Sequence, residues 1–390
     1  MKILADAHIP YLRGVAEQFG NVEYLSGNQF SRETIKDKNA LIVRTVTHFG
    51  EEILSGTNVK LICSATIGYD HIDTEYCDTH NIAWRTAPGC NANSVEQYVT
   101  ASLLHLADKY NFDLKEKTIG IVGVGNVGSK VEVACKKLGM RVLLNDPPLV
   151  ETWHAASQLS EKTPHEKTPH STPLHRPFVD LETIKRESDI ITLHTPLTKT
   201  GKHKTYHLAD ERFFDTLGKK PFIINSCRGS VVDNVALKNA LKSKKVSGAV
   251  IDCWENEPDI DQELLQLVDI ATPHIAGYSA DGKWTATKMS LENLNNFFGS
   301  GIDPIKLIPL PSPENMVINL NGIAPTNQLA YAIWHTYNPM QETKNLQENP
   351  DKFYWFRSNY PLRREYYAYE VKNASPEIVP VLKQLGFNVQ

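Results

Sequence analysis

The sequence predicts an α/β protein built on parallel sheets, and three observations support this fold class. Short apolar runs rich in β-branched residues alternate with amphipathic stretches over residues 1–275, as in strands that are connected by helices. One such run leads into the glycine-rich segment Gly123–Gly128, and a helical stripe of apolar residues follows it. The length of 390 residues exceeds one ordinary core, so two or three domains are expected.

Strands and helices are predicted from the period of their apolar residues. Asn93–Lys109 and Gly282–Phe298 have helical periodicity, and proline breaks the pattern after Gly301. Residues 301–390 are therefore expected to form a separate small module, with a helix around Asn327–His335. The candidate strands are Lys2–Ala5, Ala40–Arg44, Leu61–Ser64, Thr118–Val122, Arg141–Leu144, Ile190–His194, Phe222–Asn225, Ala249–Cys253 and Asp269–Ala271.

Residues 151–176 break the alternation of strands and helices. They repeat Glu-Lys-Thr-Pro-His in tandem at 161–165 and 166–170 and lack apolar periodicity, which predicts an inserted surface loop. The histidines at 154, 165, 170 and 175 could be read as metal ligands. A loop gives them no fixed ligand geometry, so we favour the loop and predict no metal site.

Composition restricts the classes of partner. A net charge of −4 and a pI near 6.4 give no electrostatic reason to expect nucleic acid. No apolar run approaches the roughly 20 residues that span a bilayer, and the start of the sequence lacks a signal-peptide core. The six cysteines are scattered without a C-x-x-C pair, as is usual in a reducing compartment. These observations predict a cytoplasmic protein that binds neither nucleic acid nor membrane.

The glycine segment has the context of a dinucleotide site. A strand precedes it, a helix and a second strand follow, and that strand ends at Asp146. Gly123 would make the tight turn, Gly125 would let the backbone approach a pyrophosphate, and Gly128 would permit close helix packing. The carboxylate of Asp146 would bind the ribose and repel a 2′-phosphate, which favours NAD over NADP. The predicted cofactor-binding residues of the loop are Gly123, Gly125, Asn126, Val127 and Gly128.

Polar segments follow three later strands, where open α/β sheets place their ligands. Oxidation of an alcohol beside a carboxylate needs a base and a cation. Histidine supplies the base and arginine the planar fork, while a carboxylate behind the histidine fixes its tautomer. Arg228, Glu257 and His274 fit these roles. Taken singly, they could be a solvated arginine, a turn cap and a structural histidine, but their joint occurrence after a dinucleotide unit favours a catalytic site.

Four segments together resemble the D-isomer-specific 2-hydroxyacid dehydrogenases: Gly123–Gly128, Asn225–Asp233, Asp252–Pro258 and Thr272–Ser279. The resemblance covers about residues 1–300. It implies that Arg228 orients the substrate, Glu257 supports the histidine and His274 exchanges the proton.

The same resemblance implies the domain organisation. A Rossmann-type, doubly wound parallel sheet (96–276) would be inserted in a split flavodoxin-like substrate domain (1–95 and 277–300). This substrate domain would close on the nucleotide domain, with substrate in the cleft. Residues 301–390 would form a small C-terminal α+β dimerisation domain.

Further segments resemble the family members that oxidise 4-phospho-D-erythronate in pyridoxal 5′-phosphate (vitamin B6) biosynthesis. They are Leu41–Thr47, Ala65–Asp73, Pro88–Ala92, Trp254–Pro258, His274–Ser279 and Arg357–Glu365. This similarity implies a homodimer and a small phosphorylated 2-hydroxyacid substrate. By position, substrate would contact Thr45, Thr66 and Tyr278, and NAD would contact Asp146, Thr195, Asp252 and Gly277. Position 45 usually holds serine in these members, a change that keeps the hydroxyl donor.

The substrate phosphate would need cationic donors, and Arg44, beside Thr45, is the nearest candidate. We also consider that Arg363 or Arg364 reaches the site of a partner subunit, although a solvated or interface arginine pair is at least as good an explanation. Two alternative functions stay open. One is a phosphoglycerate or other D-2-hydroxyacid dehydrogenase, and the other is a non-catalytic NAD-sensing binding protein of the same fold.

Overall fold

The computed structural model describes residues 1–152 and 178–390, so the predicted insertion at 151–176 lies outside the described residues except for its first two. The chain divides into two compact units. Unit 1 comprises Met1–Ser94, Tyr278–Pro313 and Leu362–Glu365. Unit 2 comprises Val95–Gly277, Glu314–Pro361 and Tyr366–Gln390. Residues beyond 313 thus contribute to both units, and the three-domain division stays a prediction.

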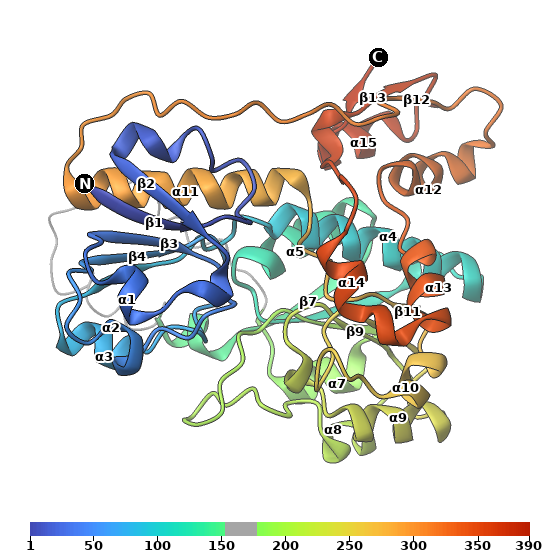
Figure 1. Cartoon of the computed structure of the whole chain (residues 1–390). Coiled ribbons are helices and arrows are strands. Elements are labelled where there is room, and N and C mark those ends of the chain that lie inside the picture. The colour runs from blue at the N-terminus through green and yellow to red at the C-terminus, as the bar shows by residue number, and fades with distance from the viewer. Residues whose placement is uncertain (153–177) are drawn as a thin grey trace, which may run out of the picture. The chain divides into compact units, whose positions relative to one another are not determined.

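Unit 1 contains a five-stranded parallel sheet of order β2-β1-β3-β4-β5, which is the flavodoxin order. Alternate residues of its strands face two separate apolar clusters, one closed by α11 and the other by the short helices α1 to α3 (Figure 1). The strands are β1 (Lys2–Asp6), β2 (Asn21–Leu25), β3 (Ala40–Val43), β4 (Leu61–Ser64) and β5 (Ala83–Arg85). The helices are α1 (Arg32–Ile35), α2 (Glu51–Leu54), α3 (Thr74–Thr79) and α11 (Ala280–Phe298).

Unit 2 contains a six-stranded parallel sheet of order β11-β10-β9-β8-β6-β7. A parallel bridge from Phe178 to Leu144 extends it beyond β7. The chain order reverses between β6 and β8, which is the switch point where doubly wound sheets bind ligands. The strands are β6 (Thr118–Val122), β7 (Arg141–Asn145), β8 (Ile190–Leu193), β9 (Phe222–Asn225), β10 (Gly248–Ile251) and β11 (Ile270–Ala271).

Helices cover both faces of this second sheet (Figure 1). Apolar residues of α4 and α5 share one cluster with the sheet, and those of α7 to α10 share the other. The helices are α4 (Ala92–Tyr110), α5 (Asn126–Lys137), α7 (Leu181–Glu187), α8 (Glu211–Asp215), α9 (Asn234–Lys242) and α10 (Gln262–Leu267). The first three residues of α4 are assigned to unit 1.

The C-terminal region of unit 2 adds a three-stranded parallel sheet of order β12-β13-β14. Helices of this C-terminal region pack on the nucleotide-binding part. The indole of Trp334 donates a hydrogen bond to the carbonyl of Ala101 at 3.2 Å. The backbone N–H of Ala271 likewise donates to Thr343 Oγ1 at 3.1 Å. The elements are β12 (Val317–Asn319), α12 (Pro325–Thr336), α13 (Met340–Glu348), α14 (Phe353–Ser358), β13 (Glu370–Lys372), α15 (Val379–Leu385) and β14 (Asn388–Val389).

Leu362–Glu365, here named the strap, is the C-terminal contribution to unit 1. The guanidinium of Arg364 pairs with Asp281 at 3.0 Å, and both side chains are buried. Arg363 donates to Ser94 Oγ, and Glu365 accepts from Ser279 Oγ at 2.9 Å. The suggestion that Arg363 or Arg364 reaches a partner's site is therefore wrong, because both guanidinium groups are buried within their own subunit.

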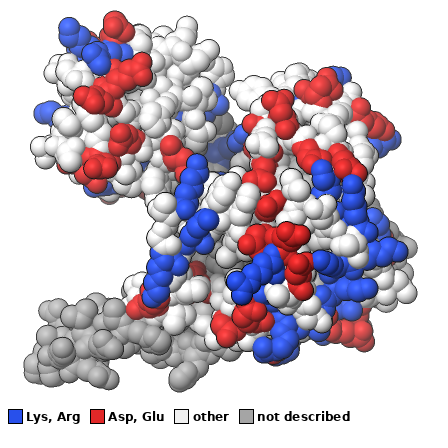
Figure 2. Space-filling view, turned by 90° about the horizontal axis from the view of Figure 1, so that it is seen from below, with Lys and Arg blue, Asp and Glu red and all other residues white. Residues whose placement is uncertain are grey.

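The surface carries charges of both signs. Acidic and basic side chains are interspersed over the face shown in Figure 2, in keeping with the small net charge of −4. Within 1–152 and 178–390, no helix combines the length and the apolar character that crossing a bilayer requires.

Candidate active site

The glycine loop joins β6 to α5 in the manner expected of a dinucleotide site. Gly123 has a φ of 89°, and a Cβ there would lie 2.7 Å from the carbonyl carbon of His194 and 2.9 Å from the nitrogen of Thr195. A Cβ on Gly128 would lie 2.0 Å from the carbonyl oxygen of Gly123. These two positions exclude side chains because the chain packs on itself.

Gly125 lacks a side chain for a different reason. It is the N-cap of α5, and a Cβ built on it would meet no atom within 4 Å. The open space lies at the N-terminus of a twelve-residue helix, whose first N–H groups attract phosphate. Asn126 and Val127 begin that helix. The residues present therefore fit a dinucleotide, with the pyrophosphate approaching Gly125.

Asp146 lies directly after β7 and reaches back to the loop. Its Oδ2 accepts a hydrogen bond from the backbone N–H of Val124 at 2.7 Å, and its Oδ1 accepts from Leu149 at 3.0 Å. Each carboxylate oxygen can accept further bonds. The structure thus links Asp146 to the glycine loop, and its bond to the ribose stays a prediction.

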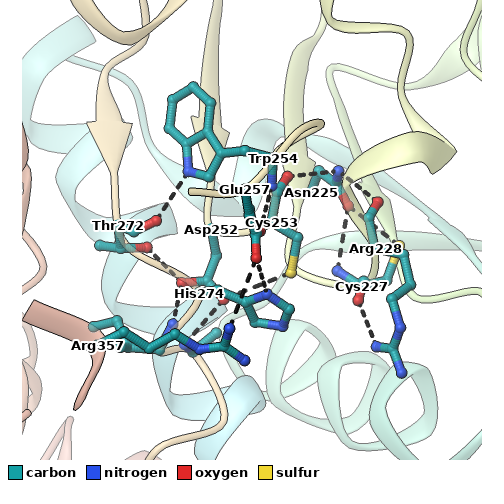
Figure 3. A network of polar contacts seen from close by, with 12 residues as sticks. Asn225, Cys227, Arg228, Asp252, Cys253, Trp254, Glu257, Thr272, His274 and Arg357 are labelled. Atoms are coloured by element: carbon teal, nitrogen blue, oxygen red, sulfur yellow. Dashed lines mark hydrogen bonds and ion pairs between the residues drawn. The ribbon is translucent and has the colours of Figure 1, made fainter. Parts of the chain in front are cut away.

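The three polar segments that follow β9, β10 and β11 are tied together by hydrogen bonds (Figure 3). The amide of Asn225 donates to the carbonyls of Arg228 at 3.0 Å and of Cys253 at 3.2 Å. The indole of Trp254 donates to the carbonyl of Thr272 at 3.0 Å. Since the strands are parallel neighbours in one sheet, their carboxyl ends meet, and these bonds hold the segments in register.

Gly229 brings the arginine segment against the glutamate segment. A Cβ at this position would lie 1.8 Å from the carbonyl oxygen of Trp254, so only glycine permits the approach. The preceding residue, Arg228, is partly exposed, and its Nη1 donates to the carbonyl of Cys227 at 2.8 Å. Gly229 thus brings the backbone of the arginine segment against the segment that carries Glu257.

His274 and Glu257 form a close pair. The Nδ1 of His274 lies 2.8 Å from Oε2 of Glu257, and Oε1 of Glu257 accepts from the backbone N–H of Trp254 at 2.8 Å. His274 has a φ of 56°, a left-handed conformation that a non-glycine residue adopts only when its surroundings impose it. The prediction that these two residues come together is met by the structure, while their catalytic roles stay proposals.

The charge state of Glu257 decides which nitrogen carries the proton. Burial alone would raise the pKa of the Glu257 carboxyl, but attraction to His274, hydrogen bonds from His274 and Trp254, and attraction to Arg357 outweigh burial. The pKa therefore lies below its usual value. An ionised carboxylate only accepts hydrogen bonds, so Nδ1 of His274 donates to it. In the neutral ring, Nε2 is then left as the acceptor.

Asp252 organises the turn that carries His274. Its buried carboxylate accepts hydrogen bonds from Thr272 Oγ1 at 2.7 Å, from Ile275 N at 2.7 Å and from Ala276 N at 3.0 Å. Burial raises the pKa of this carboxyl, against the opposing effect of His274 and these donors. Asp252 therefore has a structural task beside the predicted contact with NAD. Gly277, another predicted NAD contact, directly follows this turn.

Cys253, Glu257 and His274 place their possible ligand atoms within 4.8 Å of one another. Glu257 and His274 already bond to each other, and burial raises the pKa of the Cys253 thiol well above its usual value. A metal-binding cysteine must be a thiolate. The His274–Glu257 bond and the raised pKa of the Cys253 thiol weigh against a metal at this cluster.

The predicted substrate-binding residues Arg44, Thr45, Thr66 and Tyr278 all lie in unit 1. Arg44 and Thr45 follow β3, and Thr66 follows the neighbouring strand β4. The hydroxyl of Thr66 donates to the carbonyl of Gly68 at 3.1 Å, and Thr45 is exposed. The ammonium of Lys283 lies 4.7 Å from the centre of the Tyr278 ring.

Arg44 already has an anionic partner. Its Nε lies 2.9 Å from Oδ2 of Asp6 and its Nη2 lies 3.2 Å from Oδ1, and Asp6 is buried. A phosphate would have to share this guanidinium with a carboxylate. The ion pair weighs against Arg44 as the main phosphate ligand.

Arg357 contacts the site, although sequence reasoning gave it no role. It lies on α14, and its Nη1 is 3.9 Å from Oε2 of Glu257. Figure 3 shows Arg357 and His274 both directed at the Glu257 carboxylate. The segment Arg357–Glu365 was marked by its resemblance to a C-terminal signature, but nothing in the sequence placed it near residue 257.

Comparison with known proteins identifies the family. A family model described as "D-isomer specific 2-hydroxyacid dehydrogenase, NAD binding domain" matches residues 91–276, and one described as a domain of unknown function (DUF3410) matches residues 309–386. The chain is 46% identical over 372 residues to an erythronate-4-phosphate dehydrogenase of Bacteroides thetaiotaomicron, an alignment that covers 95% of this chain and 99% of the relative. The chain belongs to the erythronate-4-phosphate dehydrogenase family.

Other members and structures agree with this assignment. An erythronate-4-phosphate dehydrogenase of Porphyromonas gingivalis is 42% identical over 388 residues, which cover 99% of this chain and 100% of the relative. The NAD-bound 3-phosphoglycerate dehydrogenase of Entamoeba histolytica shares the fold, with a TM-score of 0.60, 23% identity, and coverage of 80% of this chain and 99% of that one. The predicted family, fold class and NAD-binding domain are confirmed.

Proposed function

We propose that this protein oxidises 4-phospho-D-erythronate to 2-oxo-3-hydroxy-4-phosphobutanoate with NAD, a step of pyridoxal 5′-phosphate biosynthesis. The observation that carries the proposal is the identity of 46%, over nearly the full length, to a relative named erythronate-4-phosphate dehydrogenase. The Glu257–His274 pair supports it, because the pair supplies the base that alcohol oxidation requires.

The glycine loop Gly123–Gly128 would hold NAD, which would supply the acceptor for the hydride of the carbon that carries the hydroxyl. His274 takes the hydroxyl proton on Nε2, since Nδ1 is held as a donor by Glu257. The imidazolium that forms is stabilised by the same carboxylate. Arg228, which precedes the glycine that packs on the backbone of Trp254, would pair with the substrate carboxylate and polarise the developing carbonyl.

A homodimer in the cytoplasm is part of this proposal. Large apolar side chains are exposed on the C-terminal region of unit 2, and exposed apolar surface favours association where such side chains adjoin. They are Met316, Val317, Tyr331, Met340, Tyr354, Trp355 and Tyr367. The six cysteines are free thiols, as is usual in a reducing compartment. We expect sedimentation equilibrium to give twice the chain mass of 43.8 kDa, and a single species of 43.8 kDa at micromolar concentration would contradict the dimer.

Formation of NADH by the purified protein tests the substrate. We expect 4-phospho-D-erythronate to give a higher kcat/KM than 3-phosphoglycerate and unphosphorylated erythronate. NADP should replace NAD poorly because the Asp146 carboxylate would repel its 2′-phosphate.

The same assay separates the alternatives. A preference for 3-phosphoglycerate would show that the substrate assignment is wrong and that the dehydrogenase chemistry is right. Tight binding of NADH without turnover of any 2-hydroxyacid would instead favour an NAD-sensing protein.

A further inference from the structure

Helix α14 has two different faces although it spans only Phe353–Ser358. Residues that are three and four positions apart share one side of a helix, so Phe353, Phe356 and Arg357 lie together. Tyr354 and Trp355 point the other way and are exposed. The helix therefore presents two aromatic rings and one guanidinium to the rest of unit 2.

The two aromatic rings fix α14 beside the catalytic pair. Phe353 is 1% exposed and belongs to the same apolar cluster as Trp254 and Ile260, and Phe356 packs against that cluster. Trp254 and Ile260 bracket Glu257 in the sequence, and the backbone N–H of Trp254 donates to that carboxylate. Burial of the rings thus holds the base of the Arg357 side chain near Glu257.

Several charged or titratable groups of the described residues lie around the pair. Glu257 faces His274 at 2.8 Å and Arg357 at 3.9 Å through the same oxygen, Oε2. His274 also interacts electrostatically with the buried carboxylate of Asp252. The Cys253 thiol is neutral because burial raises its pKa, although the positive charge of Arg228 acts in the opposite direction. Arg357 is thus a cation that shares Oε2 of Glu257 with the histidine.

We propose that Arg357 is a positioning residue for the reaction: it holds the Glu257 carboxylate and limits how strongly the His274–Glu257 pair retains a proton. This inference rests on the proposed function, in which His274 exchanges the substrate proton. A general base must be unprotonated to start the oxidation, and a nearby positive charge disfavours the imidazolium. Arg357, a residue of the C-terminal region, would thereby influence the lowest pH at which the Glu257–His274 site of the nucleotide-binding part is active.

The direct test observes His274 without substrate or NAD. The protein is labelled with ¹³C at the ring carbon Cε1 of histidine, and the His274 signal is assigned with His274→Gln. Compared with the wild type, Arg357→Met should titrate at a pH higher by about half a unit, since the opposing charge is gone. Arg357→Lys keeps the charge and should return the midpoint toward the wild-type value. Lys352→Met removes an exposed cation just before α14 and serves as the control that should not move it.

Kinetics supply a second readout. The acidic limb of kcat/KM against pH should shift upward in Arg357→Met by the same amount, with KM for 4-phospho-D-erythronate little changed at pH 9. An unmoved titration together with a raised KM would overturn the proposal and make Arg357 a substrate ligand. A titration that moves equally in the methionine and lysine variants would also overturn it, because loss of packing rather than charge would be the cause. A shifted titration in a protein without dehydrogenase activity would leave the positioning role standing and reject the proposed function.

Discussion

His274→Ala lowers kcat for 4-phospho-D-erythronate by at least about 100-fold, the usual lower size of a general-base contribution. The geometry explains why no neighbour replaces it. The carboxylate of Glu257 already bonds to His274 and to the backbone N–H of Trp254. The carboxylate of Asp252 is buried and accepts hydrogen bonds from Thr272, Ile275, Ala276 and Cys253. Neither carboxylate presents a basic atom equivalent to Nε2. Steady-state rates of NADH formation at saturating substrate measure the effect.

His207 provides a matched control for this prediction. It also has a positive φ, of 50°, and its Nε2 lies 2.7 Å from a carboxylate oxygen of Glu255. It lies outside the three segments that carry the catalytic residues, so His207→Gln should keep most of the rate. If His274→Ala were nearly as active as the wild type, His274 could not be the base. Equal losses in both variants would point to disturbed folding.

Arg364→Ala destabilises unit 1 by about 3–5 kcal/mol, because it leaves the Asp281 carboxylate buried without its partner. The pair is held by contacts of Arg364 Nε and Nη2 with Asp281 between 3.0 and 3.2 Å, and their side chains are 7% and 5% exposed. Asp281 also accepts from the backbone N–H of Glu365 at 3.0 Å. The measurement is the free energy of unfolding in urea, followed through an optical signal of unit 1.

An exposed pair gives the comparison. Arg141 contacts Glu187 at 2.8 Å, but its side chain is 61% exposed, and ion pairs of this kind contribute little to stability. Arg141→Ala should therefore leave the unfolding transition almost unchanged. Replacing Asp281 and Arg364 together by leucine and methionine should destabilise less than Arg364→Ala, because no buried charge is left. Equal stability of Arg364→Ala and the wild type would show that the pair is not buried in solution.

Much of the nucleotide-binding part could be predicted from sequence because its strands are fully buried. The predicted strands Thr118–Val122 and Phe222–Asn225 coincide with β6 and β9, whose residues are all buried. Continuous apolar runs of this kind mark parallel strands that are covered on both faces. The glycine loop could be predicted equally well, since the close approach of backbone atoms leaves no room for a side chain at Gly123 and Gly128.

Edge strands and the C-terminal sheet escaped prediction for the opposite reason. β2 and β5 lie at the two edges of their sheet and are only partly buried, so their sequences lack an apolar run. The C-terminal strands have at most three residues each, too short for a period to be recognised. The contact of Arg357 with Glu257 joins residues that are distant in the sequence. No local pattern predicts such a contact without the fold.

The strap has a consequence for how the chain is made. Asp281 leaves the ribosome 83 residues before Arg364, and β1, in the same unit, is made at the very start of the chain. At ~5–20 residues per second, the nascent carboxylate waits roughly 4–17 s for its guanidinium. Unit 1 therefore cannot close its polar interior until the strap has been made, and a nascent chain stalled before Leu362 would hold an incomplete unit 1.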